Sequence, residues 1–458
     1  MMRIRIAILT VALLTFGSGG GTARPVLAQG PAPVPAQSAG GGAPNKGAEN
    51  AADLDADVRN YDYEQLAGAL AGMPQSAERD YFAGVLANRA GDVDKSIELL
   101  NKVLPGLEST DPRRAAAGLA SLADDYVKSD RYNDAIPAYE RLLRKFVSQL
   151  DAIEKQTTED DYRTARLLKN APPQTISFGG EVDLPTHRNT LIGVIESNLT
   201  VNGVEQPWIV DTGANFSTVS ASFAARLGVR VSKGSAQTQG VTGAENKLHV
   251  ALLPELKLGG AVVHNVVLLV LDDESLDLQI GKTERYQINA VLGYPVLRAL
   301  KRVTFTKDGH LLAGAGISSG GDGARLYMDK LTPLLECEAE NRKVLFAFDT
   351  GAEQSMLSER YLRDFPEAFK GLAKEPFAMG GAGGVTTGTA YHLPEVDLGV
   401  GQARAVLHKV PVMPATGTDL DRTYGNLGRD LVDQYQSFTI DFENMRFFLG
   451  ERLEGASK

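Results

Sequence analysis

The pattern of apolar and polar positions changes three times along the 458-residue chain. An apolar run at 6–16 is followed by a stretch rich in Pro, Ala and Gly, and then by apolar positions at helical spacing from 53 to 172. After Pro172 and Pro173, short runs alternate apolar and polar residues and are bounded by turn residues. The pattern therefore predicts a leader, a linker, a helical region and a long all-β region.

The first 28 residues have the features of a signal peptide. Arg3 and Arg5 precede an apolar run that is too short to cross a bilayer, and small residues lead to Ala28. We expect cleavage after Ala28 and export to the periplasm or the extracellular space. Residues 29–52 are predicted to be a disordered linker. No later run reaches 18 apolar residues, so no membrane span is expected.

The helical region, predicted over 53–172, contains two similar segments 39 residues apart. Gly91–Leu100 is matched by Asp130–Tyr139, and upstream the small residue Gly84 is matched by Ala123. This spacing resembles the tetratricopeptide repeat, in which each helix buries one face against its neighbour. The resemblance implies a surface for a protein partner, and a plain helical spacer is the alternative.

The β region also repeats itself. Trp208–Ala214 recurs as Phe346–Ala352, and each segment ends with Asp-Thr-Gly-Ala after an apolar strand, with the two Asp 138 positions apart. A Leu-Pro-Glu triplet recurs 140 positions later, and a Leu-Gly pair recurs 135 positions later. Three landmarks in one order at nearly one offset indicate a duplication. We place the first half at 175–316 and the second at 324–452, with a Gly- and Ser-rich linker between them.

Both halves resemble aspartic peptidases of the retropepsin-like superfamily, which includes the pepsins. The resemblance implies a multidomain chain in which an α-helical repeat domain precedes two duplicated all-β halves that form a bilobal, barrel-like fold. In that family each half supplies an Asp-Thr-Gly loop, a glycine-rich hairpin called the flap, and an apolar segment ending in Gly that threads beside the loop. The threading segments here are Val291-Leu292-Gly293 and Asn426-Leu427-Gly428.

The resemblance also implies the roles of individual residues. The catalytic pair would be Asp211 and Asp349. The supporting residues would be Thr212, Gly213, Thr350 and Gly351, and the substrate-binding flaps would contain Gly240, Val241 and Gly243 in the first half and Gly381 and Gly383 in the second.

Two neighbouring carboxyl groups suit the hydrolysis of an amide. Like charges in close contact resist joint ionisation, so the pair holds one proton and offers both a base for water and an acid for the leaving group. Ala214 and Ala352 stand where other members carry Ser or Thr, whose hydroxyl would lower the pKa of the carboxyl group. We therefore predict a pH optimum nearer neutral than that of a gastric enzyme.

Composition limits which partners, disulfides, metals and cofactors are possible. The net charge of −10 argues against a nucleic-acid partner. The single cysteine, Cys337, excludes an internal disulfide framework and a Cys-based zinc cluster, and the six His residues lack metal-binding spacing. No metal or cofactor is expected. The expected partners are a polypeptide substrate in extended conformation and a protein that binds the helical repeats.

The sequence therefore predicts an exported, monomeric aspartic endopeptidase with an intramolecular Asp dyad. Two alternatives stay open at this point. One is a homodimer in which the halves pair in trans. The other is a peptidase-like scaffold of the cell envelope that binds peptides with little turnover and acts through its helical repeats.

Overall fold

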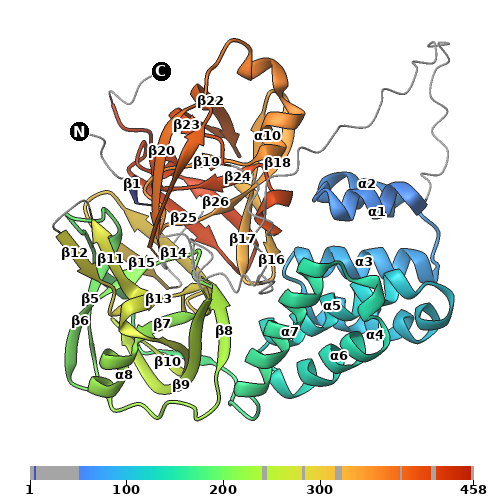
Figure 1. The fold of residues 1–458 in the computed structure, drawn as a ribbon, viewed down its shortest axis with the longest axis horizontal. Helices are drawn as coiled ribbons and strands as arrows, with labels where there is room; N and C mark the ends of the chain where they lie inside the picture. Colours follow the sequence, from blue (N-terminus) through green and yellow to red (C-terminus); the bar gives the residue numbers. More distant parts are fainter. Residues whose placement is uncertain are drawn as a thin grey trace, which may run out of the picture.

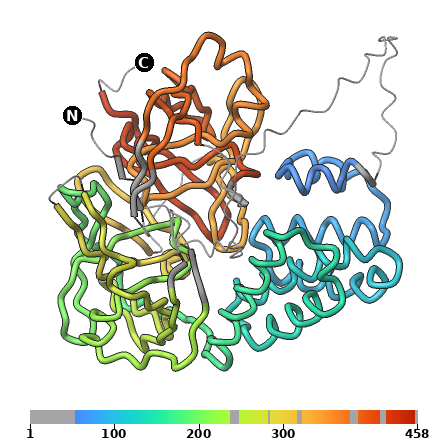
Figure 2. Tube along the Cα trace, in the orientation of Figure 1, coloured from blue at the N-terminus to red at the C-terminus, as the bar shows by residue number. Residues whose placement is uncertain are grey.

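The computed structural model describes residues 5–6, 51–239, 245–280, 284–314, 322–381, 384–413 and 419–454. Helices α1 to α7 gather on one side of the molecule, and the strands form two groups beside them (Figure 1). The trace in Figure 2 runs from the helices (blue to cyan) through the first group of strands (green to yellow) to the second (orange to red). A helical region followed by a large β-rich region is thus confirmed. The described strands form open sheets, with no closed barrel among them.

The helical region packs its helices in sequence, each against the next. Ser76, Asp111 and Asp151 cap three of them by accepting a hydrogen bond from the backbone N–H three residues later. None of the helices described is long and apolar enough to cross a membrane. The helices are α1 (Ala51–Arg59), α2 (Tyr63–Gly72), α3 (Ala77–Arg89), α4 (Val93–Thr110), α5 (Pro112–Lys128), α6 (Tyr132–Lys145) and α7 (Ala152–Leu167).

Small residues lie where these helices cross closely. A Cβ atom on Gly84 of α3 would lie 3.0 Å from the Leu100 side chain of α4, and Ala123 is fully buried. The two matched positions of the sequence repeat therefore both sit in tight packing. The resemblance to tetratricopeptide repeats itself stays a prediction.

The first β region, residues 175–314, is built around one nine-stranded sheet. Its main path runs β4-β5-β6-β13-β7-β10-β9-β8, and β2 pairs with β10. These strands are β2 (Thr175–Phe178), β4 (His187–Arg188), β5 (Ile195–Val201), β6 (Val204–Val210), β7 (Ser217–Ser220), β8 (Ala236–Gln239), β9 (Glu245–Leu258), β10 (Ala261–Leu271) and β13 (Ala290–Leu292). Helices α8 (Ala221–Leu227) and α9 (Tyr294–Ala299) follow β7 and β13, and β11 (Asp277–Ile280) pairs with β12 (Glu284–Gln287).

The second β region, residues 322–454, belongs to a twelve-stranded sheet. Its strands are β16 (Ala324–Asp329), β17 (Thr332–Ala339), β18 (Arg342–Phe348), β19 (Met356–Leu357), β22 (His392–Val400), β23 (Ala403–Pro411), β24 (Gly425–Leu427), β25 (Ser437–Asp441) and β26 (Arg446–Leu449). Two short helices are α10 (Glu359–Asp364) and α11 (Arg429–Val432). The hairpin of β20 (Glu375–Gly381) and β21 (Gly384–Ala390) lies apart from this sheet, and β1 (Arg5–Ile6) pairs with β20.

The large sheet continues across the boundary that the sequence placed between the halves. It also contains β3 (Val182–Pro185), β14 (Arg302–Thr306) and β15 (His310–Ala313), which precede that boundary. Strand β14 pairs antiparallel with β25 along its whole length. One buried apolar cluster accordingly spans both β regions, and the two regions share a core.

Candidate active site

Each Asp-Thr-Gly loop leaves the end of a strand that is paired with a threading segment. Strand β6 pairs in parallel with β13, and β18 pairs in parallel with β24. The Asp211 N–H donates to Leu292 O, and the Asp349 N–H donates to Leu427 O, both at 3.0 Å. The two β regions thus place their loops through the same local pairing.

Glycine at the end of each threading segment allows this close packing. A Cβ on Gly293 would lie 2.5 Å from the carbonyl carbon of Phe216, and one on Gly428 would lie 2.8 Å from Ala352 O. Real Cβ atoms do not approach backbone so closely, so only glycine fits at these positions. The glycine of each threading motif, apolar-apolar-Gly or Asn-Leu-Gly, therefore allows the segment to pack closely beside the loops and to hold them in place.

The two loops are joined by reciprocal hydrogen bonds. The Thr212 N–H donates to Thr350 Oγ1, and the Thr350 N–H donates to Thr212 Oγ1, both at 3.0 Å. Each hydroxyl also donates to the strand before the opposite loop: Thr212 Oγ1 to Phe348 O at 3.2 Å and Thr350 Oγ1 to Val210 O at 2.9 Å. Both Thr side chains are fully buried, so these four bonds hold the loops in one fixed relation.

This frame brings the Asp211 and Asp349 side chains together. Each is at most 2% exposed, and the two carboxyl groups lie close enough to influence each other's pKa. Asp211 Oδ1 accepts from the Gly213 N–H at 2.8 Å, and Asp349 Oδ1 accepts from the Gly351 N–H at 2.7 Å. A Cβ on Gly351 would lie 2.7 Å from Asp211 Oδ2, so a larger residue there would press on the opposite carboxyl.

Burial raises the pKa of both carboxyl groups above the ordinary value for Asp. The effect is larger at Asp211, where the neighbouring negative charge of Asp349 adds to the burial. Hydrogen bonds from the Gly351 N–H and from Asn426 oppose the rise of the pKa of Asp349. The two carboxyl groups therefore titrate as one coupled pair, which holds a single proton over a range of pH above the ordinary value for Asp.

Asn426 makes the pair asymmetric. Its Nδ2 donates to Asp349 Oδ2 at 3.4 Å, which favours the ionised form of Asp349. The corresponding residue of the first threading segment is Val291, whose side chain has no donor. From the sequence alone Asn426 is only part of the threading segment, and no pattern there predicts this contact.

Two serine residues that the sequence analysis also missed support the threading segments. Ser217 Oγ accepts from the Gly293 N–H at 3.1 Å, and Ser355 Oγ accepts from the Gly428 N–H at 3.0 Å. Each Ser stands six residues after an Asp of the pair, so the same offset of 138 that relates Asp211 to Asp349 would have found them.

The predicted flap residues are only partly described. Gly240, Val241, Gly243 and Gly383 lie outside the described residues, and Gly381 ends β20, opposite Gly384 of β21. Strands β8 and β9 flank the first tip as an antiparallel pair. Antiparallel strands therefore flank both predicted tips, while the flap role of these tips and their contacts with the Asp pair stay predictions.

Comparison with known proteins supports a peptidase assignment for part of the chain. Residues 197–296 match the aspartyl protease family model. This segment contains Asp211, Thr212 and Gly213 together with the first threading segment. No protein of curated function matches the chain in sequence.

Solved structures with some similarity include two plant seed proteins and one bacterial protease. Conglutin gamma from lupine seeds is 12% identical, with a TM-score of 0.38 over 62% of this chain and 97% of that chain. Basic 7S globulin from soybean is 12% identical, with a TM-score of 0.36 over 60% and 95%. A retropepsin-like aspartic protease from Rickettsia conorii is 21% identical, with a TM-score of 0.19 over 31% and 90%.

Proposed function

We propose that this chain is an aspartic endopeptidase in which Asp211 and Asp349 form one intramolecular catalytic pair. The observation that carries the proposal is the set of reciprocal Thr212–Thr350 bonds, which hold two buried carboxyl groups side by side. The repeated strand pairing around the two loops supports a duplicated origin for the halves.

The proposed reaction uses one proton and one water molecule. Ionised Asp349 accepts a proton from water as the oxygen attacks the peptide carbonyl carbon, and protonated Asp211 donates to the carbonyl oxygen. The resulting tetrahedral diol collapses when Asp349 passes the proton that it took from water to the nitrogen of the scissile bond and the C–N bond breaks. Asp211 takes a proton back from one of the hydroxyl groups, which leaves a carboxylic acid and an amine and restores the pair. The backbone N–H groups of Gly213 and Gly351 hold the carboxyl groups in place throughout.

An extended polypeptide is the proposed substrate. The β20–β21 hairpin lies outside the large sheet, and in the structure the edge of β20 pairs with the extended segment β1 at Met379 and Gly380. This pairing supports main-chain recognition of an extended chain by the hairpin.

The direct test is cleavage of an unfolded protein by the purified chain that starts at Gln29. We expect new N-termini within the substrate, identified by mass spectrometry, and inhibition by a peptide whose scissile amide is replaced by hydroxyethylene. Absence of cleavage, with retained binding of that peptide, would instead support the peptide-binding scaffold.

The activity should peak above the ordinary pKa of Asp, which is about 4. Activity needs one proton on the pair, so it is lost when the second proton binds at low pH and when the last proton leaves at high pH. Because burial raises both pKa values, both pH limits of the activity move upward.

Ala214→Ser and Ala352→Ser should each shift the acid limb of the kcat–pH profile to lower pH, since the added hydroxyl stabilises the ionised carboxylate. An unchanged acid limb in both variants would contradict this explanation of the pH range.

Asn426→Val should move the acid limb in the opposite direction. The substitution removes the donor to Asp349 Oδ2, so the pKa of Asp349 rises and the base is protonated at higher pH. The matched variant Val291→Asn offers a donor beside Asp211 and should lower the pH at which activity is lost on the alkaline side. A pH profile of kcat for each variant measures both effects, and a uniform loss of activity without any shift would argue against the asymmetry.

Export remains part of the proposal and rests on residues 1–28. Expression with the full N-terminus in a bacterial host should release a protein that begins at Gln29, as read by N-terminal sequencing of the periplasmic fraction. Retention of residues 1–28 on that protein would contradict the predicted cleavage. A protein partner of the helical repeats stays a prediction.

A further inference from the structure

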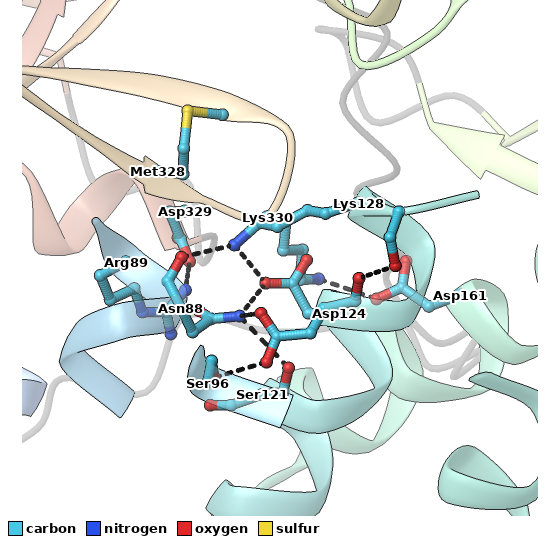
Figure 3. Close-up of polar contacts among 12 residues, drawn as sticks. Asn88, Arg89, Ser96, Ser121, Asp124, Lys128, Asp161, Met328, Asp329 and Lys330 are labelled. Atoms are coloured by element: carbon cyan, nitrogen blue, oxygen red, sulfur yellow. Dashed lines mark hydrogen bonds and ion pairs between the residues drawn. The ribbon is translucent and has the colours of Figure 1, made fainter. Parts of the chain in front are cut away.

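The turn between β16 and β17 lies between the helical region and the first β region. Asp329 pairs with Thr332 in the hairpin register, so Lys330 and Leu331 form a two-residue turn. Asp329 and Lys330 point toward Asn88, Arg89 and Asp124 of the helical region in Figure 3, whereas Met328 points away from them. We call residues 328–332 the linking turn.

Polar contacts attach the linking turn to the helical region. Asp329 accepts from Arg89 Nη1 and from the Tyr61 hydroxyl, both at 2.5 Å, and Lys330 Nζ lies 3.0 Å from the Asp161 carboxylate. Although burial opposes ionisation, Arg89 and Tyr61 hold the pKa of Asp329 below its ordinary value. The Asp329 carboxylate is therefore ionised in these contacts over the pH range in which the Asp211–Asp349 pair would be active.

The helical surface that receives the turn is itself held by a buried network (Figure 3). Asn88 Nδ2 donates to Asp124 and to Asp125 at 2.8 Å each, and Lys128 Nζ lies 2.6 Å from Asp124. These bonds tie α3 to α5 directly beside Arg89. A displacement of the helices would therefore move the linking turn with them.

On its other side the linking turn contacts the Asp211 loop. Thr332 Oγ1 donates to Asn215 Oδ1 at 3.2 Å, and Asn215 stands four residues after Asp211. The Tyr294 hydroxyl donates to Met328 Sδ at 3.3 Å, and the Tyr294 N–H donates to Ala214 O at 2.8 Å. Two short chains of contacts thus join the turn to residues 214 and 215.

The backbone of the turn is strained. Lys330 has φ +52°, in the left-handed region that residues with a Cβ seldom adopt. Such conformations persist where surrounding contacts fix them, and here the Lys330 side chain is held by Asp161. The contacts to the helical region therefore help determine the shape of the turn.

We propose that the linking turn transmits the docking of the helical region to the Asp211 loop, so that the helical region positions one half of the Asp pair. Asp329 and Thr332 are then positioning residues that act through Asn215. The effect on catalysis rests on the proposed peptidase function, whereas the effect on the loop does not.

The experiment compares Asp329→Asn and Thr332→Val with a matched control, Asp80→Asn. Asp80 is also an ion-paired Asp of low exposure, with 4% of its side chain exposed against 12% for Asp329. It pairs with Lys102 at 2.8 Å, but this pair lies wholly within the helical region. Amide hydrogen exchange of residues 211–216 is measured on the full chain, together with kcat and KM. We expect both turn variants to raise the exchange rate of these amides about 10-fold and to lower kcat about 10-fold with KM changed less than about 2-fold, whereas the control does neither.

The double variant measures directly how strongly Asp329 and Thr332 are coupled. If the two residues act on one path, Asp329→Asn and Thr332→Val together should have an effect smaller than the product of their separate effects. Faster exchange confined to the helical region, or an equal effect of Asp80→Asn on residues 211–216, would overturn the proposal. If Asp329→Asn does not fold, Arg89→Lys takes its place in the same comparison. Faster exchange at 211–216 in a chain with no peptidase activity would uphold the linkage and reject only the proposed function.

Discussion

Asp211→Asn and Asp349→Asn should each reduce peptide hydrolysis by about 10³-fold or more, because either change removes the shared proton site on which acid and base catalysis depend. The two variants are expected to be equally inactive, since one pair serves the whole molecule. Steady-state hydrolysis of the peptide substrate measures the loss. Full loss in only one variant would instead indicate separate sites formed by like halves of two chains.

The same substitutions should leave the fold intact and raise its stability near neutral pH. The folded-state pKa of each Asp lies above its unfolded value, so the native protein loses stability as the pH rises from about 4 through the folded pKa values. An Asn side chain does not ionise and avoids this loss. Thermal unfolding at pH 4 and pH 7 should therefore show a stability gain that appears only at the higher pH. A lower melting temperature at both pH values would show that the inactive variants are merely damaged.

Thr212→Val and Thr350→Val are expected to cause the second largest loss. Valine at position 212 leaves the buried Thr350 N–H without its acceptor, which costs about 1–3 kcal/mol of unfolding free energy. The loop then no longer fixes the carboxyl groups in contact, and a displacement of about 1 Å lowers the rate about 10²-fold. Chemical denaturation and kcat measure the two effects.

Thr212→Ser and Thr350→Ser are the matched controls. Serine keeps both the hydroxyl donor and the hydroxyl acceptor and removes only a methyl group. We expect these variants to retain most of the activity and stability. A loss in the Ser variants as large as that in the Val variants would assign the effect to packing of the methyl group and not to the hydrogen bonds.

Motifs with a fixed spacing could be predicted from the sequence because they carry their structure locally. Asp-Thr-Gly after an apolar strand and Leu-Gly in a threading segment each define a strand end and a turn. In the structure the two Asp follow β6 and β18, and the Leu-Gly pairs stand at the ends of β13 and β24. Thr212 and Thr350 belong to the same motif, so their supporting role is also predicted from it. The order of a helical region before a β-rich region follows from the change in hydrophobic period.

Contacts between distant segments could not be predicted in this way. Neither Asn426 nor Asp329 belongs to a periodic pattern, and their roles depend on which side chain the fold places opposite them. The continuation of the large sheet through β14 likewise arises from pairing with β25, which lies 135 residues away. Pairing of distant strands is set by the assembled core and not by the local sequence.

Mixing the two inactive variants tests the intramolecular pair most directly. Asp211→Asn and Asp349→Asn chains are combined, unfolded and refolded together, and assayed over a range of concentrations. The account predicts that the mixture stays inactive, while activity of the native chain rises in proportion to its concentration. Recovery of about a quarter of the native activity would contradict the account, because exchange of halves between two chains would rebuild one intact pair in every mixed dimer.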